Sequence, residues 1–140
     1  MSHDRGAVRT ASCNCGQLRV TCTGEPVRLS MCHCLECQKR TGSPFGVQAR
    51  FPRAQVTIGG TATEFTRVGE QGNRISLRFY PTCGSTLYWT MSSQPDLIAV
   101  AVGNFADPAF PVPRFSVFEK RRHPWVAVPD HAEMQRQQTQ

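Results

Sequence analysis

Three cysteines gather within six residues in the stretch Cys32-His33-Cys34-Leu35-Glu36-Cys37. One disulfide would use two of these thiols and leave the third without a partner, whereas a zinc ion accepts several thiolates from one tight loop. Three thiolates leave one tetrahedral position to be filled from elsewhere. If no protein group fills it, the site is of the open, reactive kind rather than the closed, structural kind. The spacing therefore predicts a zinc site formed by Cys32, Cys34 and Cys37.

A second group of cysteines is spread over two distant segments, with Cys13 and Cys15 in one and Cys83 in the other. Each segment runs into a glycine, Gly16 or Gly84, and glycine permits the tight bends that such a site requires. Strands can bring distant segments together, and the three cysteines would then hold a structural zinc with one ligand fewer than usual. Taken alone, Cys83 would be interpreted as a small buried apolar residue.

Cys22 and His33 are two further residues of types that can bind a metal. Cys22 alternates with apolar residues on a predicted strand, so we expect it in the core. His33 lies between two predicted ligands, and adjacent residues rarely reach one metal. We therefore expect His33 beside the zinc, as a hydrogen-bonding group or as a base near the open position. A redox pair of Cys34 and Cys37 has the thioredoxin spacing, but the sequence lacks the βαβ pattern that accompanies it.

Short strands must position these cysteines. The chain has 140 residues with 11 glycines and 10 prolines, which favours strands joined by turns over long helices. A single helical turn is predicted over 38–41, ending at Gly42. The sequence thus predicts a mainly β domain over 7–129, a flexible N-terminus over 1–6 and a disordered polar tail over 130–140. Alternation and apolar runs place strands at 18–22, 27–31, 45–51, 56–58, 61–68, 74–80, 87–91, 97–102 and 115–118.

The composition of the sequence limits the cellular locations and the kinds of binding partner that we expect. The sequence has no apolar run near the ~20 residues of a membrane helix, and its polar first residues do not resemble a signal peptide. We expect a cytoplasmic protein without membrane partners, in which clustered cysteines are ligands or catalytic groups rather than disulfides. The formal net charge of +6 comes mostly from scattered arginines. It predicts a mildly basic, solvated surface, suits an anionic small molecule, and gives nucleic-acid binding little support.

The cysteine motifs resemble those of the glutathione-dependent formaldehyde-activating enzyme family, which also includes centromere protein V-like proteins. The resemblance implies a β-tent fold of the Mss4-like type around two zinc ions. It assigns Cys32, Cys34 and Cys37 to a catalytic zinc, and matches the other three cysteines to a structural one. The motifs are Cys13-x-Cys15-Gly16, Cys32-His33-Cys34-x-x-Cys37 with Thr41-Gly42-Ser43, Cys83-Gly84-Ser85, and Arg122-His123-Pro124-Trp125.

The chain departs from the family at one ligand position. The fourth ligand of the structural zinc normally lies three residues before Cys83, where this sequence has Tyr80. A phenol with a pKa near about 10 is a poor zinc ligand at neutral pH. Three outcomes stay open: a site completed by water or by another side chain such as Cys22 or His3, a weak site, or no metal.

The resemblance implies a carbon–sulfur lyase that joins glutathione and formaldehyde, or releases them, as S-hydroxymethylglutathione. A related thiol and aldehyde are also open as substrates. Arg40 is expected to hold a carboxylate of the thiol, and Phe45 to line the same pocket together with His33. Two other functions stay open. One is a zinc-stabilised binding module without turnover, as in the centromere protein V branch, and the other is a redox-sensing zinc switch.

Overall fold

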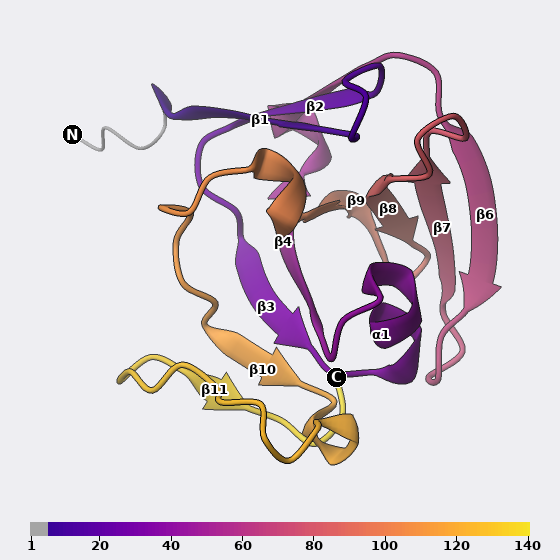
Figure 1. Cartoon of the computed structure of the whole chain (residues 1–140). Coiled ribbons are helices and arrows are strands. Elements are labelled where there is room, and N and C mark those ends of the chain that lie inside the picture. Colours follow the sequence, from indigo (N-terminus) through magenta and orange to yellow (C-terminus); the bar gives the residue numbers. More distant parts are fainter. Residues whose placement is uncertain (1–5) are drawn as a thin grey trace.

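Eleven strands and one α-helix form the regular structure of residues 6–140, the part of the chain that this computed structural model describes. They build two sheets, one ordered β1-β2-β5 and the other β11-β10-β3-β4-β9-β8-β7-β6 (Figure 1). The elements are β1 (Val8–Ser12), β2 (Arg19–Thr23), β3 (Arg28–Cys32), α1 (Leu35–Thr41), β4 (Gly46–Pro52), β5 (Val56–Gly59), β6 (Thr63–Val68), β7 (Arg74–Phe79), β8 (Thr86–Met91), β9 (Gln94–Ala101), β10 (Phe115–Val117) and β11 (Gln135–Arg136).

The small sheet is built on an antiparallel hairpin of β1 and β2, and β5 pairs with the other edge of β2. The turn of the hairpin carries the Cys-x-Cys segment and bends at Gly16, whose φ of 82° lies in the region that glycine tolerates. Along β2, Val20 and Cys22 are fully buried while Arg19 and Thr23 are exposed. This alternation buries one face of the small sheet.

The main core lies between the small sheet and the middle of the large one. β3, β4 and β8 are mostly buried and β9 is buried over its second half, whereas β6 forms an exposed edge. β10 joins β3 in parallel, so two segments more than 80 residues apart in sequence lie side by side. The largest fully buried side chains are those of Phe51, Leu18, Leu87, Ile98, His33, Val20, Val100 and Val117.

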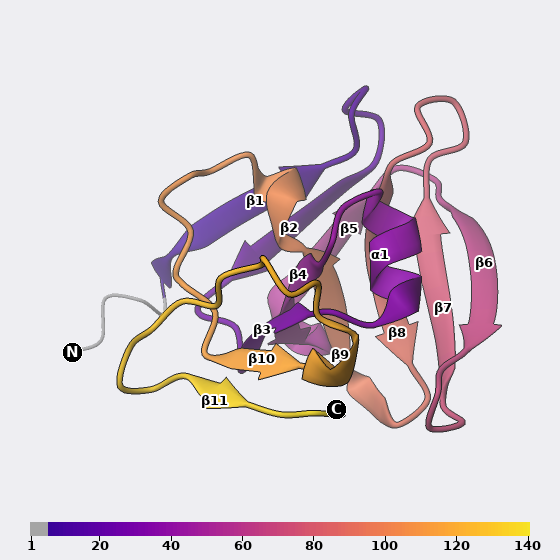
Figure 2. The same cartoon turned by 60° about the horizontal axis from the view of Figure 1, so that its bottom comes forward.

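The mainly β fold with one short helix confirms the predicted fold class, but two predicted boundaries are wrong. The helix begins at Leu35 rather than at residue 38, because the side chain of Cys34 caps it by accepting the N–H of Cys37. The tail over 130–140, predicted to be disordered, contains β11, which pairs in parallel with β10. Figure 2 shows this yellow segment running alongside β10.

Backbone hydrogen bonds hold the tail in place, and such bonds cannot be predicted from the amino-acid composition of the tail. The N–H groups of Phe118 and Glu119 donate to the carbonyls of Thr139 and Gln137. The polar sequence of the tail lacks the apolar residues from which order is normally inferred. The predicted flexibility of residues 1–6 falls, apart from Gly6, outside the described residues. None of the helices in residues 6–140 is long and apolar enough to cross a membrane.

Candidate metal centre

Cys32, Cys34 and Cys37 converge at the junction between β3 and α1. Their sulfur atoms all lie within 4.8 Å of one another, and each residue is less than a tenth exposed. Cys32 is the last residue of β3, Cys34 is the N-cap of α1, and Cys37 lies in its first turn. The N–H of Cys37 donates to the sulfur of Cys34 at 3.3 Å, so the start of the helix fixes two of the three thiols.

The thiols are too close together to ionise independently. Hydrogen bonds from Cys32 and Cys37 lower the pKa of the Cys34 thiol to about 2. The hydrogen bond to Cys34 raises the pKa of the Cys32 thiol far above its ordinary value, and burial adds to this effect. Three thiolates would repel one another strongly in this buried position. A divalent cation removes that repulsion, so the donor set fits a soft metal such as zinc.

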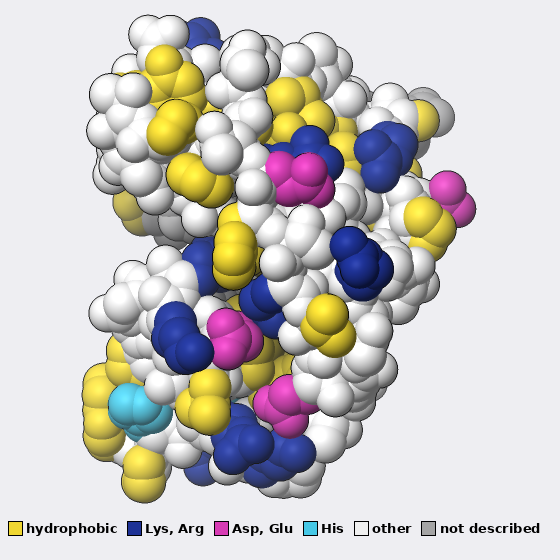
Figure 3. Space-filling model, turned by 90° about the vertical axis from the view of Figure 1, so that its right-hand side faces the viewer, with side chains coloured by type: hydrophobic (Ala, Val, Ile, Leu, Met, Phe, Trp, Pro, Cys, Tyr) yellow, Lys and Arg dark blue, Asp and Glu magenta, His cyan; other side chains and the backbone are white. Residues whose placement is uncertain are grey.

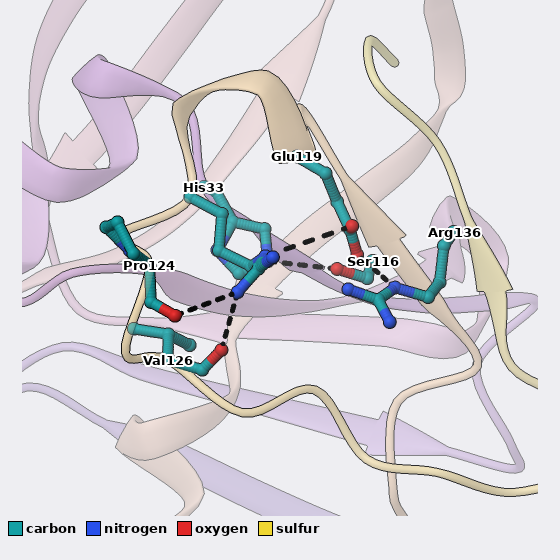
Figure 4. Close-up of polar contacts among 7 residues, drawn as sticks. His33, Ser116, Glu119, Pro124, Val126 and Arg136 are labelled. Carbon is teal, nitrogen blue, oxygen red and sulfur yellow. Dashed lines mark hydrogen bonds and ion pairs between the residues drawn. The ribbon is translucent and has the colours of Figure 1, made fainter.

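His33 is not part of this cluster, in keeping with the alternating direction of neighbouring side chains in an extended chain. Its ring is fully buried, and Nε2 lies 2.9 Å from the hydroxyl of Ser116 in β10 (Figure 4). Burial lowers the pKa of His33, although the charge of Glu119 opposes this. The expectation that His33 lies near an open metal position is therefore not met by this geometry.

The contacts around His33 connect the C-terminal segment to the segment that carries Cys32, Cys34 and Cys37. Glu119, whose side chain is 6% exposed, accepts a hydrogen bond of 2.8 Å from Nε of Arg136 in β11. Its other carboxylate oxygen lies 3.9 Å from Nε of Arg122. Arg122 in turn donates from Nη1 to the carbonyl of Val126 at 2.9 Å. These contacts join the motif around Arg122 to the strand that follows Asp130.

A cavity of about 760 Å³ opens beside Cys32, Cys34 and Cys37. Arg40 lines it, as predicted for a substrate-binding residue, and its guanidinium lies 4.5 Å from the centre of the Trp89 ring. Phe45, predicted to line the same pocket, does not: its ring packs against His33, with the two ring centres 6.0 Å apart. The face of the molecule in Figure 3 is hollowed, and basic side chains gather around and within the hollow.

The second predicted set of cysteines also comes together. The sulfur atoms of Cys13, Cys15 and Cys83 lie within 4.8 Å of one another, and those of Cys13 and Cys15 are 3.7 Å apart. The N–H of Leu18 donates to the sulfur of Cys13 at 3.3 Å, as expected of a bend that wraps a thiolate. This cluster joins the hairpin of the small sheet to the turn between β7 and β8, and it does not border the cavity.

Cys22 does not belong to the second cluster among the residues that the structure describes. Tyr80 is partly buried against the main core, and its carbonyl accepts the N–H of Gly84. Cys22 is fully buried in the same core, where burial raises the pKa of its thiol to about 12. His3, suggested as another fourth ligand, lies outside the described residues.

Two arginines of the cavity wall, Arg28 and Arg50, were not singled out from the sequence. Both alternate along their strands with core residues, Leu29 in β3 and Ala49 and Phe51 in β4. In the sequence they therefore resemble the solvent-facing side of a half-buried strand, and no local signal identifies them.

Comparisons with known proteins agree with this architecture. The sequence profile described as glutathione-dependent formaldehyde-activating enzyme matches residues 8–121, which is more than half of the chain. The fold is also similar to the crystal structure of a Rhodobacter sphaeroides protein determined in a structural genomics programme. That similarity has a TM-score of 0.55 at 17% identity, and covers 73% of this chain and 90% of the other. A search of curated proteins gave no significant match.

Proposed function

The chain belongs to the glutathione-dependent formaldehyde-activating enzyme family, and we propose that it is a zinc-dependent carbon–sulfur lyase acting on a thiol–aldehyde adduct. S-hydroxymethylglutathione is the first candidate for that adduct. In the synthetic direction the thiol sulfur forms a bond to the carbonyl carbon, the carbon–oxygen double bond becomes single, and the thiol proton ends on oxygen. The step is redox-neutral and needs no further reactant.

The observation that carries the proposal is the position of one cysteine cluster at a cavity. Cys32, Cys34 and Cys37 line a space of about 760 Å³, which is within the usual size range of small-molecule sites. Three protein ligands and an adjoining cavity are what a catalytic zinc site requires, whereas a structural site is normally closed by a fourth protein ligand. The Cys13, Cys15 and Cys83 cluster does not line this cavity, which supports a structural role.

In this proposal each group of residues at the site has its own role. Cys32, Cys34 and Cys37 would hold the metal. Zinc in that position favours the thiolate form of a bound thiol and polarises a carbonyl oxygen. Trp89 and Met91 form an apolar wall that reduces the access of water to the reacting groups. Arg40, which stacks on Trp89, is held in a fixed direction to bind an anionic group of the substrate.

Exchange spectroscopy by NMR tests the activity without an added indicator. Glutathione and formaldehyde interconvert with their adduct slowly enough for the exchange to be followed, and the zinc-loaded protein should increase the exchange rate at concentrations far below those of the substrates. Thiols also add to formaldehyde unaided, so the rate without protein is the essential baseline. S-methylglutathione, which has no free thiol, serves as the substrate control.

Calorimetry separates this function from the two alternatives. Saturable binding of glutathione that S-methylglutathione does not reproduce would support a thiol site at the metal. Absence of both binding and accelerated exchange, with every candidate thiol and aldehyde tried, would favour a binding module without turnover. Zinc release under mild peroxide, reversed by a reductant, would favour a redox switch.

A further inference from the structure

Two arginines face each other across the cavity wall. Arg28 of β3 and Arg50 of β4 are directly opposite one another in the antiparallel register of these strands, so both side chains lie on the same face of the sheet. Both line the cavity that contains Cys32, Cys34 and Cys37. Like charges at opposite positions of a strand pair destabilise a sheet. Arg50 is only 6% exposed, which adds a cost of desolvation.

Within residues 6–140, no carboxylate forms an ion pair with either arginine. Arg50 donates from Nη1 to the side-chain oxygen of Gln94 at 2.9 Å, and Arg28 lies 3.8 Å from the centre of the Phe115 ring. Both partners are neutral. The Nε atom of each arginine is buried and has no hydrogen-bond partner among the described residues. Burial lowers the pKa of both guanidinium groups, as expected for cations without a counter-ion.

The acidic groups of the cavity wall are already engaged elsewhere. Glu36 pairs with Lys39 at 3.2 Å, and Glu70 pairs with Lys120 and Arg121. Three thiolates on a divalent metal would supply one net negative charge. The guanidinium groups of Arg28, Arg40, Arg50 and Arg67 bring four positive charges to the same cavity, so the metal centre balances only part of them.

We propose that Arg28 and Arg50 form a carboxylate-binding subsite, and that the substrate transformed beside the cysteine cluster carries the carboxylate held there. The identity of the reacting group rests on the proposed function, whereas the subsite itself rests on the cavity. A planar carboxylate matches the fork of a guanidinium group and can accept hydrogen bonds from both arginines. The stability cost of an unbalanced arginine pair is typical of positions kept for binding.

The carboxylate can belong to the thiol or to the aldehyde, and two probes distinguish them. S-methylglutathione carries the carboxylates of glutathione without its free thiol, and glyoxylate is an aldehyde with a carboxylate. Trp89 lines the cavity, and the only other tryptophan, Trp125, is 73% exposed. In a Trp125→Phe background of the zinc-loaded protein, fluorescence therefore reports on Trp89 alone.

At least one probe should change the Trp89 emission saturably. Arg28→Gln and Arg50→Gln should each weaken its binding by about tenfold or more, the usual effect of losing a charge-assisted hydrogen bond. Arg74→Gln is the matched control, because Arg74 is exposed on β7 and does not line the cavity. The diethyl ester of S-methylglutathione should bind equally to wild type and variants. Arg50→Lys, which keeps the charge but not the fork, should bind less tightly than wild type.

Several results would overturn the subsite. These are equal binding by wild type and both glutamine variants, tighter binding of inorganic phosphate than of either carboxylate, or no binding of either probe.

Both variants should keep or gain thermal stability, because each substitution relieves the repulsion between the two guanidinium groups. A large loss of stability would mean that the pair is structural. Carboxylate binding without lyase turnover would support the subsite and count against the proposed function. If both variants turn over carboxylate-bearing substrates as fast as the wild type, the result would support the proposed function and count against the subsite.

Discussion

Cys34 has two roles that a single substitution separates. Its sulfur is a predicted metal ligand, and it also caps α1 by accepting the N–H of Cys37. Serine is one of the best N-cap residues, so Cys34→Ser should preserve the helix while removing one thiolate. We expect the variant to lose about one zinc per chain and all accelerated thiol–aldehyde exchange, with an unchanged circular dichroism spectrum. Elemental analysis measures the zinc, and global unfolding of the variant would make this site structural.

Cys22 should not react with thiol reagents in the folded protein. It is fully buried, and burial raises the pKa of its thiol to about 12, so almost no thiolate is present at neutral pH. Removal of the metal with a chelator should make Cys34 and Cys83, the clustered thiols with lowered pKa values, react with iodoacetamide. Cys22 should react only when a denaturant is added, as followed by mass spectrometry of the digested protein. Modification of Cys22 in the native, zinc-loaded protein would show that this part of the core opens readily.

The candidate ligands could be predicted from the sequence because their evidence is local. The spacing of Cys32, Cys34 and Cys37 brings three thiols to one turn, and the structure places them together. The orientation of His33 could not be predicted in this way. It depends on Ser116, which lies 83 residues further along the chain. The same is true of Arg28 and Arg50, whose opposition depends on the register of two strands.

At the scale of elements, the contact between the small sheet and the loop after β5 depends on Gly60. Its φ is 94°, and an added Cβ would overlap the backbone carbonyl of Gln17. Gly60→Ala should therefore destabilise the protein by more than about 2 kcal/mol in denaturant unfolding, since the backbone cannot move as a side chain can. It should also weaken metal binding at Cys13 and Cys15, because Gln17 follows them in the same hairpin turn.

Gly72 is the matched control for this substitution. Its φ of 88° is similar, but nothing lies within 4 Å of an added Cβ. Gly72→Ala should cost only the strain of a left-handed alanine, roughly 1–2 kcal/mol, and leave both metal sites intact. Equal losses in the two variants would mean that the contact with Gln17 contributes nothing beyond backbone strain.

The ion pair between Glu119 and Arg136 predicts a pH dependence for the attachment of β11. Burial raises the pKa of Glu119, but hydrogen bonds from Arg136 and Ser116 and the charges of Arg136 and Arg122 outweigh it, so the pKa lies below its ordinary value. A lowered folded-state pKa stabilises the fold above the unfolded-state pKa, and this stabilisation is lost as the pH falls through the folded value.

Glu119→Gln isolates this contribution. The wild type should exceed the variant in free energy of unfolding by about 1–2 kcal/mol near neutral pH, the magnitude expected for hydrogen bonds to a charged group. The difference should be constant between about pH 6 and 8 and shrink below about pH 4.5, where the unfolded-state carboxyl becomes protonated. Both proteins lose metal in acid, so only their difference is informative. A difference that persists in strong acid would rule out the ion pair as its source.

At the scale of the whole molecule, alternation and turn residues were enough to predict the mainly β class, because they are local properties of short segments. Pairing between distant segments was not accessible in the same way. β11 contains only Gln135 and Arg136, and neither residue favours a strand by itself. Its order comes from β10 and Glu119, which precede it by 16 or more residues. A tail that is polar in composition thus becomes part of the cavity, which Gln137 and Gln140 help to line.

Removal of residues 131–140 tests whether this tail is part of the working protein. None of these residues belongs to the buried core, so the truncated chain should still fold and bind metal at both cysteine clusters. It should lose about 1–3 kcal/mol of stability with the ion pair and backbone hydrogen bonds of β11. It should also raise the KM for the thiol–aldehyde adduct more than it changes kcat, because Gln137 and Gln140 line the cavity but are none of the three cysteine ligands. Arg136→Gln, which keeps Gln137 and Gln140, should reproduce the loss of stability with a smaller rise in KM. A truncated chain with unaltered stability and kinetics would mean that the order of the tail has no consequence for the site.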